Sequence, residues 1–125
     1  MNNRSFGASL KFAMAILFLP TLLWSIQSGE PVKTFAGEIT DSICAPAGSH
    51  TVTIARTPGM GNDSESCTRK CATMGAKYVL LDQATHNVYL LDSQDKLAEF
   101  AGHKVRVVGT VNGNAIKISN IAELG

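Results

Sequence analysis

The sequence has no excess of charge of either sign. Eleven Lys and Arg residues stand against ten Asp and Glu residues, and the formal net charge is +1. Without the two basic residues near the N-terminus, Arg4 and Lys11, the balance becomes nine basic against ten acidic side chains. Binding to nucleic acid or to an anionic membrane surface needs a concentration of basic residues. The charge balance therefore argues against both of these partners, and it identifies no other.

Sequence motifs of the common catalytic classes are also missing. The chain has no G-x-S-x-G nucleophile signature and no Gly-rich phosphate loop. Cys-x2-Cys-His, which attaches haem covalently, does not occur either. Asp41 has the chemistry of a general acid or base, but the sequence places no second carboxylate beside it. We therefore expect a non-enzymatic protein.

The N-terminal segment predicts export. Arg4 and Lys11 are followed by the unbroken apolar run "FAMAILFLPTLLWSI" at 12–26. A basic head, a short apolar stretch and then small or polar residues are typical of a secretory signal peptide. The run falls short of the roughly 20 residues of a comfortable membrane span. We expect a signal peptide over 1–28 and a periplasmic or extracellular protein with no membrane attachment after cleavage; an uncleaved anchor is the alternative.

The rest of the chain predicts one small domain. Residues 29–33 form a linker and 34–125 the domain, within which apolar and polar residues alternate as in half-buried strands. Strands are expected at 34–40, 77–82, 87–92, 103–111 and 115–121, with a short helix at 93–102. Five such strands favour an all-β fold, a small OB-like Greek-key barrel with one or two short helices. A split sandwich is the competing architecture.

Two cysteines lie on a predicted helix between the first two strands. In "ESCTRKCATMGAK" (65–77), Asp63 or Ser64 can cap the start and Gly75 can end the helix. Positions four and seven apart share a helix face, which puts Cys67, Cys71 and Met74 together. The preceding stretch, 45–63, reads mainly as loop, and "HTVTIAR" (50–56) suggests a short β-segment within it. The first cysteine also lies near the helix N-terminus, where the backbone dipole stabilises a thiolate.

These residues suggest a metal site or a disulfide. Cys44, His50, Cys67 and Cys71 have the composition of a tetrahedral zinc site. Thiolates with His and Met favour copper instead. Weaker candidate ligands are Asp41, Met60 and Met74. Zinc and copper are therefore the expected ions, although the Cys-x3-Cys spacing matches no strong metal motif.

Oxidation is the principal alternative to metal binding. Export permits disulfides, and a bridge from Cys44 to Cys67 or Cys71 would tie the helix to the barrel and leave one thiol over. A second alternative is a thiol-redox or copper-handling protein in which Cys67 and Cys71 react or pass on an ion. A third is a purely structural or ligand-binding module that holds a glycan or peptide on its strands.

The combined motifs resemble a family of small exported bacterial domains of unknown function. The stretches that carry the resemblance are "GEITDSICA", a following His50, "CTRKCATMGAKYVLLD", "VYLLD", "FAGHKVRVVGTV" and "AIKISNI". They cover nearly all of the expected mature chain. The resemblance implies an OB-like barrel and no particular activity. It also implies a shared cluster of Cys, His and Asp at Asp41, Cys44, His50, Cys67 and Cys71.

Overall fold

The computed structural model describes residues 29–48 and 50–125, so the predicted signal peptide at 1–28 lies outside the described residues. Within these ranges the strands are β1 (Val32–Asp41), β2 (Tyr78–Asp82), β3 (Asn87–Leu91), β4 (Lys104–Asn112) and β5 (Ala115–Glu123). The helices are α1 (His50–Arg56), α2 (Ser64–Thr73) and α3 (Gln94–Leu97), with 3-10 turns at Ala45–Ala47 and Ala98–Phe100. The first strand thus begins inside the predicted linker.

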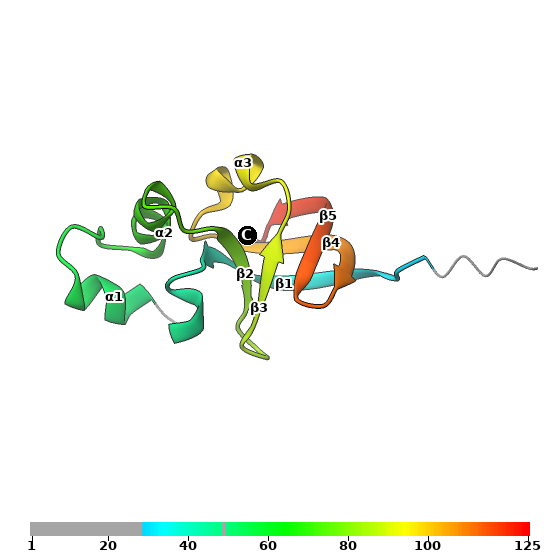
Figure 1. Cartoon of the computed structure of the whole chain (residues 1–125), viewed down its shortest axis with the longest axis horizontal. Helices are drawn as coiled ribbons and strands as arrows, with labels where there is room; N and C mark the ends of the chain where they lie inside the picture. Colours follow the sequence, from blue (N-terminus) through cyan, green and yellow to red (C-terminus); the bar gives the residue numbers. More distant parts are fainter. Residues whose placement is uncertain (1–28, 49) are drawn as a thin grey trace, which may run out of the picture.

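The strands close into a barrel (Figure 1). Their order is β1, β2, β3, β5, β4, and β4 pairs back onto β1. All neighbours are antiparallel except β3 and β5, which run parallel over a short seam where Leu90 and Leu91 face Ala115 and Ile116. Closure by five short strands in this order is the arrangement of a small OB-like barrel. The predicted fold class is confirmed.

Alternating apolar residues fill the barrel. In β4, Val105 and Val107 are fully buried while their neighbours Lys104 and Arg106 are exposed, as the period of two requires. The central cluster is Ile39, Leu80, Leu91, Leu97, Val105, Val107 and Ile116. This core is separate from a second, smaller buried cluster that contains the cysteines.

The helix that carries the cysteines is inserted between β1 and β2, as predicted. Figure 1 shows α1 and α2 together beyond one end of the barrel, with α3 apart from them. Asp63 caps α2 by accepting from the Ser66 N–H, and the Ser66 side chain returns a bond to the cap backbone. Past the end of α2, Gly75 adopts the left-handed φ of +97° that such an ending favours. The sequence signals for both ends of the helix are confirmed.

A close backbone approach fixes α2 against the barrel. Gly102, in the turn before β4, has a φ of +77°, and a methyl group there would overlap the backbone of Ser64 and Glu65 at the start of α2. Only glycine combines this conformation with that contact. The turn therefore sets how near the helix sits to the strands.

The prediction of a β-segment at 50–56 was wrong. These residues form α1, despite the Thr and Ile that favour strands. Ile54 of this helix packs against the buried cysteine cluster, and no strand of the barrel offers its edge to the segment in the described part of the chain. Tertiary contact with α2 outweighs the local preference.

Candidate metal centre

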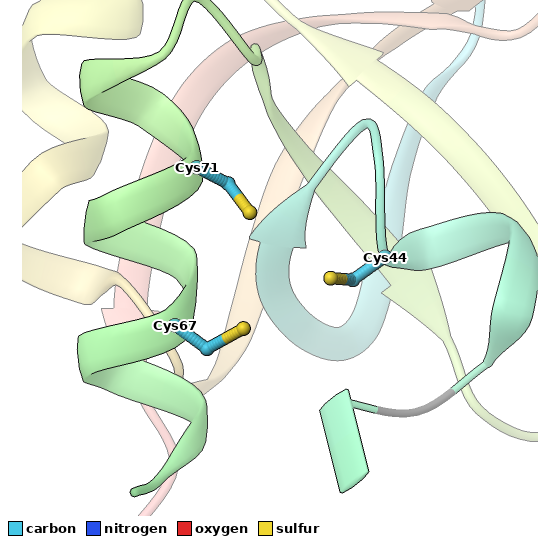
Figure 2. Close-up of side chains that lie close together, drawn as sticks. All are labelled: Cys44, Cys67 and Cys71. Carbon is cyan, nitrogen blue, oxygen red and sulfur yellow. The ribbon is translucent and has the colours of Figure 1, made fainter. Parts of the chain in front are cut away.

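Three thiols from two parts of the chain meet beneath α2. The Sγ atoms of Cys44, Cys67 and Cys71 all lie within 4.8 Å of one another. Figure 2 shows Cys67 and Cys71 projecting from one face of α2 towards Cys44, which follows β1. None of the three is more than 1% exposed, and all three are free thiols. We call this set the thiol triad.

A turn at the end of β1 places Cys44. One carboxylate oxygen of Asp41, Oδ1, accepts hydrogen bonds from the backbone N–H groups of Ile43 and Cys44, each at 2.9 Å. The Cys44 thiol in turn donates to the Thr53 hydroxyl of α1, 3.3 Å away. Aspartate commonly bonds to the backbone of such turns. The turn that begins at Asp41 therefore directs the Cys44 sulfur towards α2.

A second group of donors shares Cys44. Donor atoms of Asp41, Cys44 and His50 also lie within 4.8 Å of one another, and all three residues are buried. The other carboxylate oxygen, Asp41 Oδ2, and the imidazole atom His50 Nδ1 are buried without a hydrogen-bond partner. Buried polar atoms in proteins are nearly always paired. Asp41 Oδ2 and His50 Nδ1 are therefore two buried polar atoms, close to the thiols, that could act as ligands of a cation.

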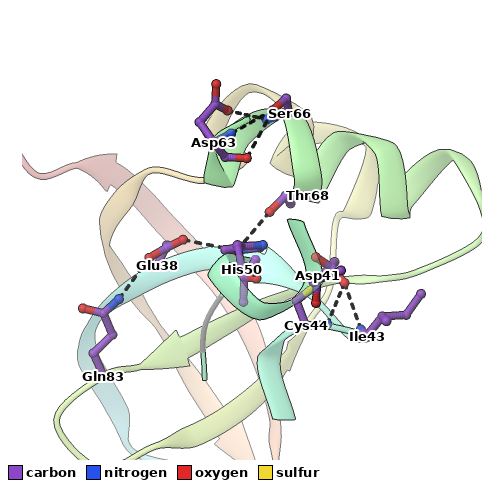
Figure 3. Close-up of polar contacts among 11 residues, drawn as sticks. Glu38, Asp41, Ile43, Cys44, His50, Asp63, Ser66, Thr68 and Gln83 are labelled. Carbon is purple, nitrogen blue, oxygen red and sulfur yellow. Dashed lines mark hydrogen bonds and ion pairs between the residues drawn. The ribbon is translucent and has the colours of Figure 1, made fainter. Parts of the chain in front are cut away.

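The remaining imidazole nitrogen is held by a polar network (Figure 3). The hydroxyls of Thr40 and Thr68 lie 2.8 and 3.4 Å from His50 Nε2. Glu38 Oε1 lies 3.4 Å from the same nitrogen. Glu38 and the two threonines were not predicted as site residues. The one signal in the sequence for Glu38 and Thr40 is alternation along β1, which places both on the same face of the strand, whereas Thr68, on α2, has no such signal.

Burial opposes ionisation of the thiols on α2. It raises the pKa of Cys67 to about 11, with the neighbouring Cys44 as the next cause. It raises the pKa of Cys71 to about 12, with the negative charge of Asp41 next and then Cys44. The helix dipole expected to favour a Cys67 thiolate is outweighed by loss of solvent. These directions are the reverse of what a reactive, redox-cycling thiol requires.

The remaining Met and His residues differ in whether they lie beside the thiol triad. Met60 is buried and packs in the same cluster as the thiol triad. Met74 is the C-cap residue of α2; it is 57% exposed and lies outside the buried cluster. His103, which was not predicted as a ligand, belongs to neither donor group, and its Nδ1 contacts Glu123 at 2.7 Å. The structure thus brings together Asp41, Cys44, His50, Met60, Cys67 and Cys71.

Comparison with protein-family models, with curated proteins and with solved structures finds no match. Among the described residues, no helix is long and apolar enough to cross a bilayer. The chemistry of the site is therefore inferred from its geometry alone.

Proposed function

We propose that the protein is an exported, non-enzymatic barrel domain that binds one thiophilic metal ion through Cys44, Cys67 and Cys71. The observation that carries this proposal is the convergence of three buried free sulfurs next to two unpaired buried donors, Asp41 Oδ2 and His50 Nδ1. The resemblance to exported bacterial domains of unknown function supports the same cluster and adds no activity.

A metal ion accounts for more of the site than a disulfide does. A bridge between two of the three sulfurs leaves the third thiol buried beside the carboxylate of Asp41, whose Oδ2 remains without a partner. A bound cation removes the mutual repulsion of the ionised thiols. It also places a positive charge near the unpaired Asp41 Oδ2 and His50 Nδ1. Burying polar groups without such compensation is costly.

The donor set favours zinc or copper(I). Thiolates are soft ligands that select these ions over magnesium or calcium. Three thiolates alone match a three-coordinate copper(I) ion, whereas zinc needs a fourth ligand, for which Asp41, whose carboxylate lies beside the Cys44 sulfur, is the candidate. Met60 adds a thioether to the lining of the same cluster.

Metal content and free thiols, measured together, test the proposal. We expect the reduced mature protein, loaded with Zn2+ or Cu+ and desalted, to keep one ion per chain by elemental mass spectrometry. Protein recovered from the export compartment without reductant should show three thiols on denaturation with a chelator. Cys67→Ser and Cys71→Ser should each lose about 10-fold or more in affinity, because loss of a direct ligand should cost at least as much as loss of the outer partners that orient ligands.

Lys70→Ser is the matched control, because Lys70 is exposed on the same helix. It should bind as tightly as the unaltered protein. Protein that arrives with two thiols consumed in a bridge, and that takes up no metal after reduction, would show that the cluster is a structural disulfide.

A further inference from the structure

The buried thiol triad needs a route by which an ion reaches it. Cys67 and Cys71 have no exposed surface, and Cys44 has 1%. A cavity of about 240 Å³ borders Cys44 and His50 and opens to solvent. Its lining residues include Glu38, Thr40, Cys44, His50, Asp63 and Gln83. The cavity therefore borders the one residue, Cys44, that both donor groups share.

The charge of the cavity suits a cation. Among the described residues that line it are two carboxylates, Glu38 and Asp63, and no Lys or Arg. A cleft lined by one sign of charge concentrates ions of the other sign and speeds their association. An ion in this cavity meets negative charge before it meets sulfur.

Glu38 joins the outer and inner parts of the cavity. Its Oε2 accepts from Gln83 Nε2 at 3.0 Å on the exposed side. Its Oε1 is buried without a hydrogen bond and lies 3.4 Å from His50 Nε2 on the inner side. Figure 3 shows Gln83, Glu38 and His50 in this sequence. Beyond His50 lie the unpaired Asp41 Oδ2 and the Cys44 sulfur.

We propose that this cavity is the uptake route for the metal ion, and that Asp41, Cys44 and His50 form an uptake subsite at its inner end. The inference rests on the proposed function, since it concerns how the same ion arrives. Donors become softer along the route, from the carboxylate of Glu38 to imidazole and then to thiolate. Cys44 is a ligand in both the uptake subsite and the thiol triad. The ion can therefore pass from one to the other while it stays bound to the Cys44 sulfur.

This arrangement has a kinetic signature. Glu38 lowers the free energy of passage but is no ligand of the final site, so its loss changes the rates of uptake and release by the same factor. The dissociation constant then stays the same. Loss of a residue that holds the ion in its final position instead raises the dissociation constant, chiefly through faster release.

The test uses Glu38→Gln, which keeps the size of the side chain and removes its charge. We expect stopped-flow loading of the reduced, metal-free protein with Zn2+ to slow by about 10-fold. Release to excess chelator should slow by the same factor, with an equilibrium affinity within about threefold of the unaltered protein. Glu99→Gln is the control: the same change at an exposed glutamate that does not line the cavity. It should leave both rates unchanged.

His50→Ala separates an uptake residue from a final ligand. We expect slower loading and an affinity within about threefold of the unaltered protein, whereas Cys67→Ser loses affinity. If His50→Ala weakens the affinity as much as Cys67→Ser does, His50 belongs to the final site and the uptake subsite is wrong. Unchanged rates in both Glu38→Gln and His50→Ala overturn the uptake route alone. Failure of the unaltered protein to bind Zn2+ or Cu+ overturns the proposed function itself.

Discussion

Cys44 is the residue on which both donor groups depend. It belongs to the thiol triad and to the uptake subsite, and Asp41 fixes its backbone through two hydrogen bonds. Its two sulfur partners come from a helix that starts some twenty residues later in the chain. A substitution at Cys44 should therefore disturb the site more broadly than one at either helix cysteine.

The raised pKa values predict how the metal-free protein responds to alkali. An unfolded thiol ionises near its ordinary pKa of 9.0, whereas the folded protein holds the protons of Cys67 and Cys71 up to about 11 and 12. The unfolded state therefore binds fewer protons between these values, and folding stability falls as pH rises. We expect the free energy of unfolding of metal-free protein to be highest below pH 9 and to decline towards pH 12.

Urea titrations at a series of pH values, with the metal-free protein under reductant, measure this decline. Alkylation by iodoacetamide at pH 8 should be slow for the same reason, because thiolate is the reacting form. A double variant, Cys67→Ser with Cys71→Ser, should lose most of the alkaline dependence. Rapid native alkylation of Cys67 or Cys71 at pH 8 would instead support the thiol-redox alternative.

At this scale the sequence predicts which residues carry the chemistry but not all of their neighbours. Cysteine and histidine are recognisable by type, so Cys44, His50, Cys67 and Cys71 could be named from the sequence. Glu38 could not, because its contact with His50 depends on where α1 folds back over β1. Met74 was expected on the sulfur-bearing face and is exposed, because helical spacing alone does not show how far along α2 the packing against Cys44 and Met60 extends.

At the scale of elements, the position of α2 depends on its contact with the turn before β4. Gly102→Ala adds a methyl group that overlaps the helix backbone and forces a non-glycine residue to a φ of +77°. We expect a loss of about 2–4 kcal/mol in the free energy of unfolding, from strain and overlap together. Because the helix must move away, metal affinity should fall as well.

Gly113→Ala separates the two causes. Gly113 also has a positive φ, +61°, but a methyl group there meets no atom within 4 Å. It should lose about 1 kcal/mol from backbone strain alone and keep its metal affinity. Denaturant unfolding and zinc titration of both variants measure the difference. Equal losses in the two variants would mean that the approach of Gly102 to α2 contributes nothing.

The helices show that capping residues predict where a helix begins and ends better than residue propensity predicts whether a segment is helix or strand. Asp63 and Gly75 bound α2 where the sequence predicts, because capping and a left-handed ending are local chemistry. The segment 50–56 forms α1 rather than a strand, because its conformation is decided by packing on α2 and the cysteines. A β-segment needs a free strand edge, and the sequence does not reveal that the barrel closes without one.

For the whole molecule, metal binding should act on stability as well as on the site. An ion held by Cys44 and by the helix thiols links the end of β1 to α2 and closes the long connection between them. A ligand that binds only the folded state at 100 times its dissociation constant adds about 2.7 kcal/mol to the free energy of unfolding. We expect Zn2+ at that concentration to raise the melting temperature by several degrees.

Calorimetry with and without Zn2+ checks this expectation. At the same Zn2+ concentration Cys67→Ser should show about half of the rise or less, because a 10-fold loss of affinity leaves about 1.4 of the 2.7 kcal/mol. Lys70→Ser should show the full rise. An equal rise in Cys67→Ser would place the ion elsewhere on the molecule. We expect the barrel itself to fold without the ion, because its core cluster is separate from the thiol triad.

The length of strand pairing differs around the barrel. β3 and β5 meet over two facing pairs of residues, whereas β4 pairs with both of its neighbours along most of its length. In the order of the ring this weak joint lies opposite β1, the strand that leads into the metal centre. Thermal opening of the barrel should therefore begin at the β3–β5 joint, away from the β1 end that leads into the thiol triad.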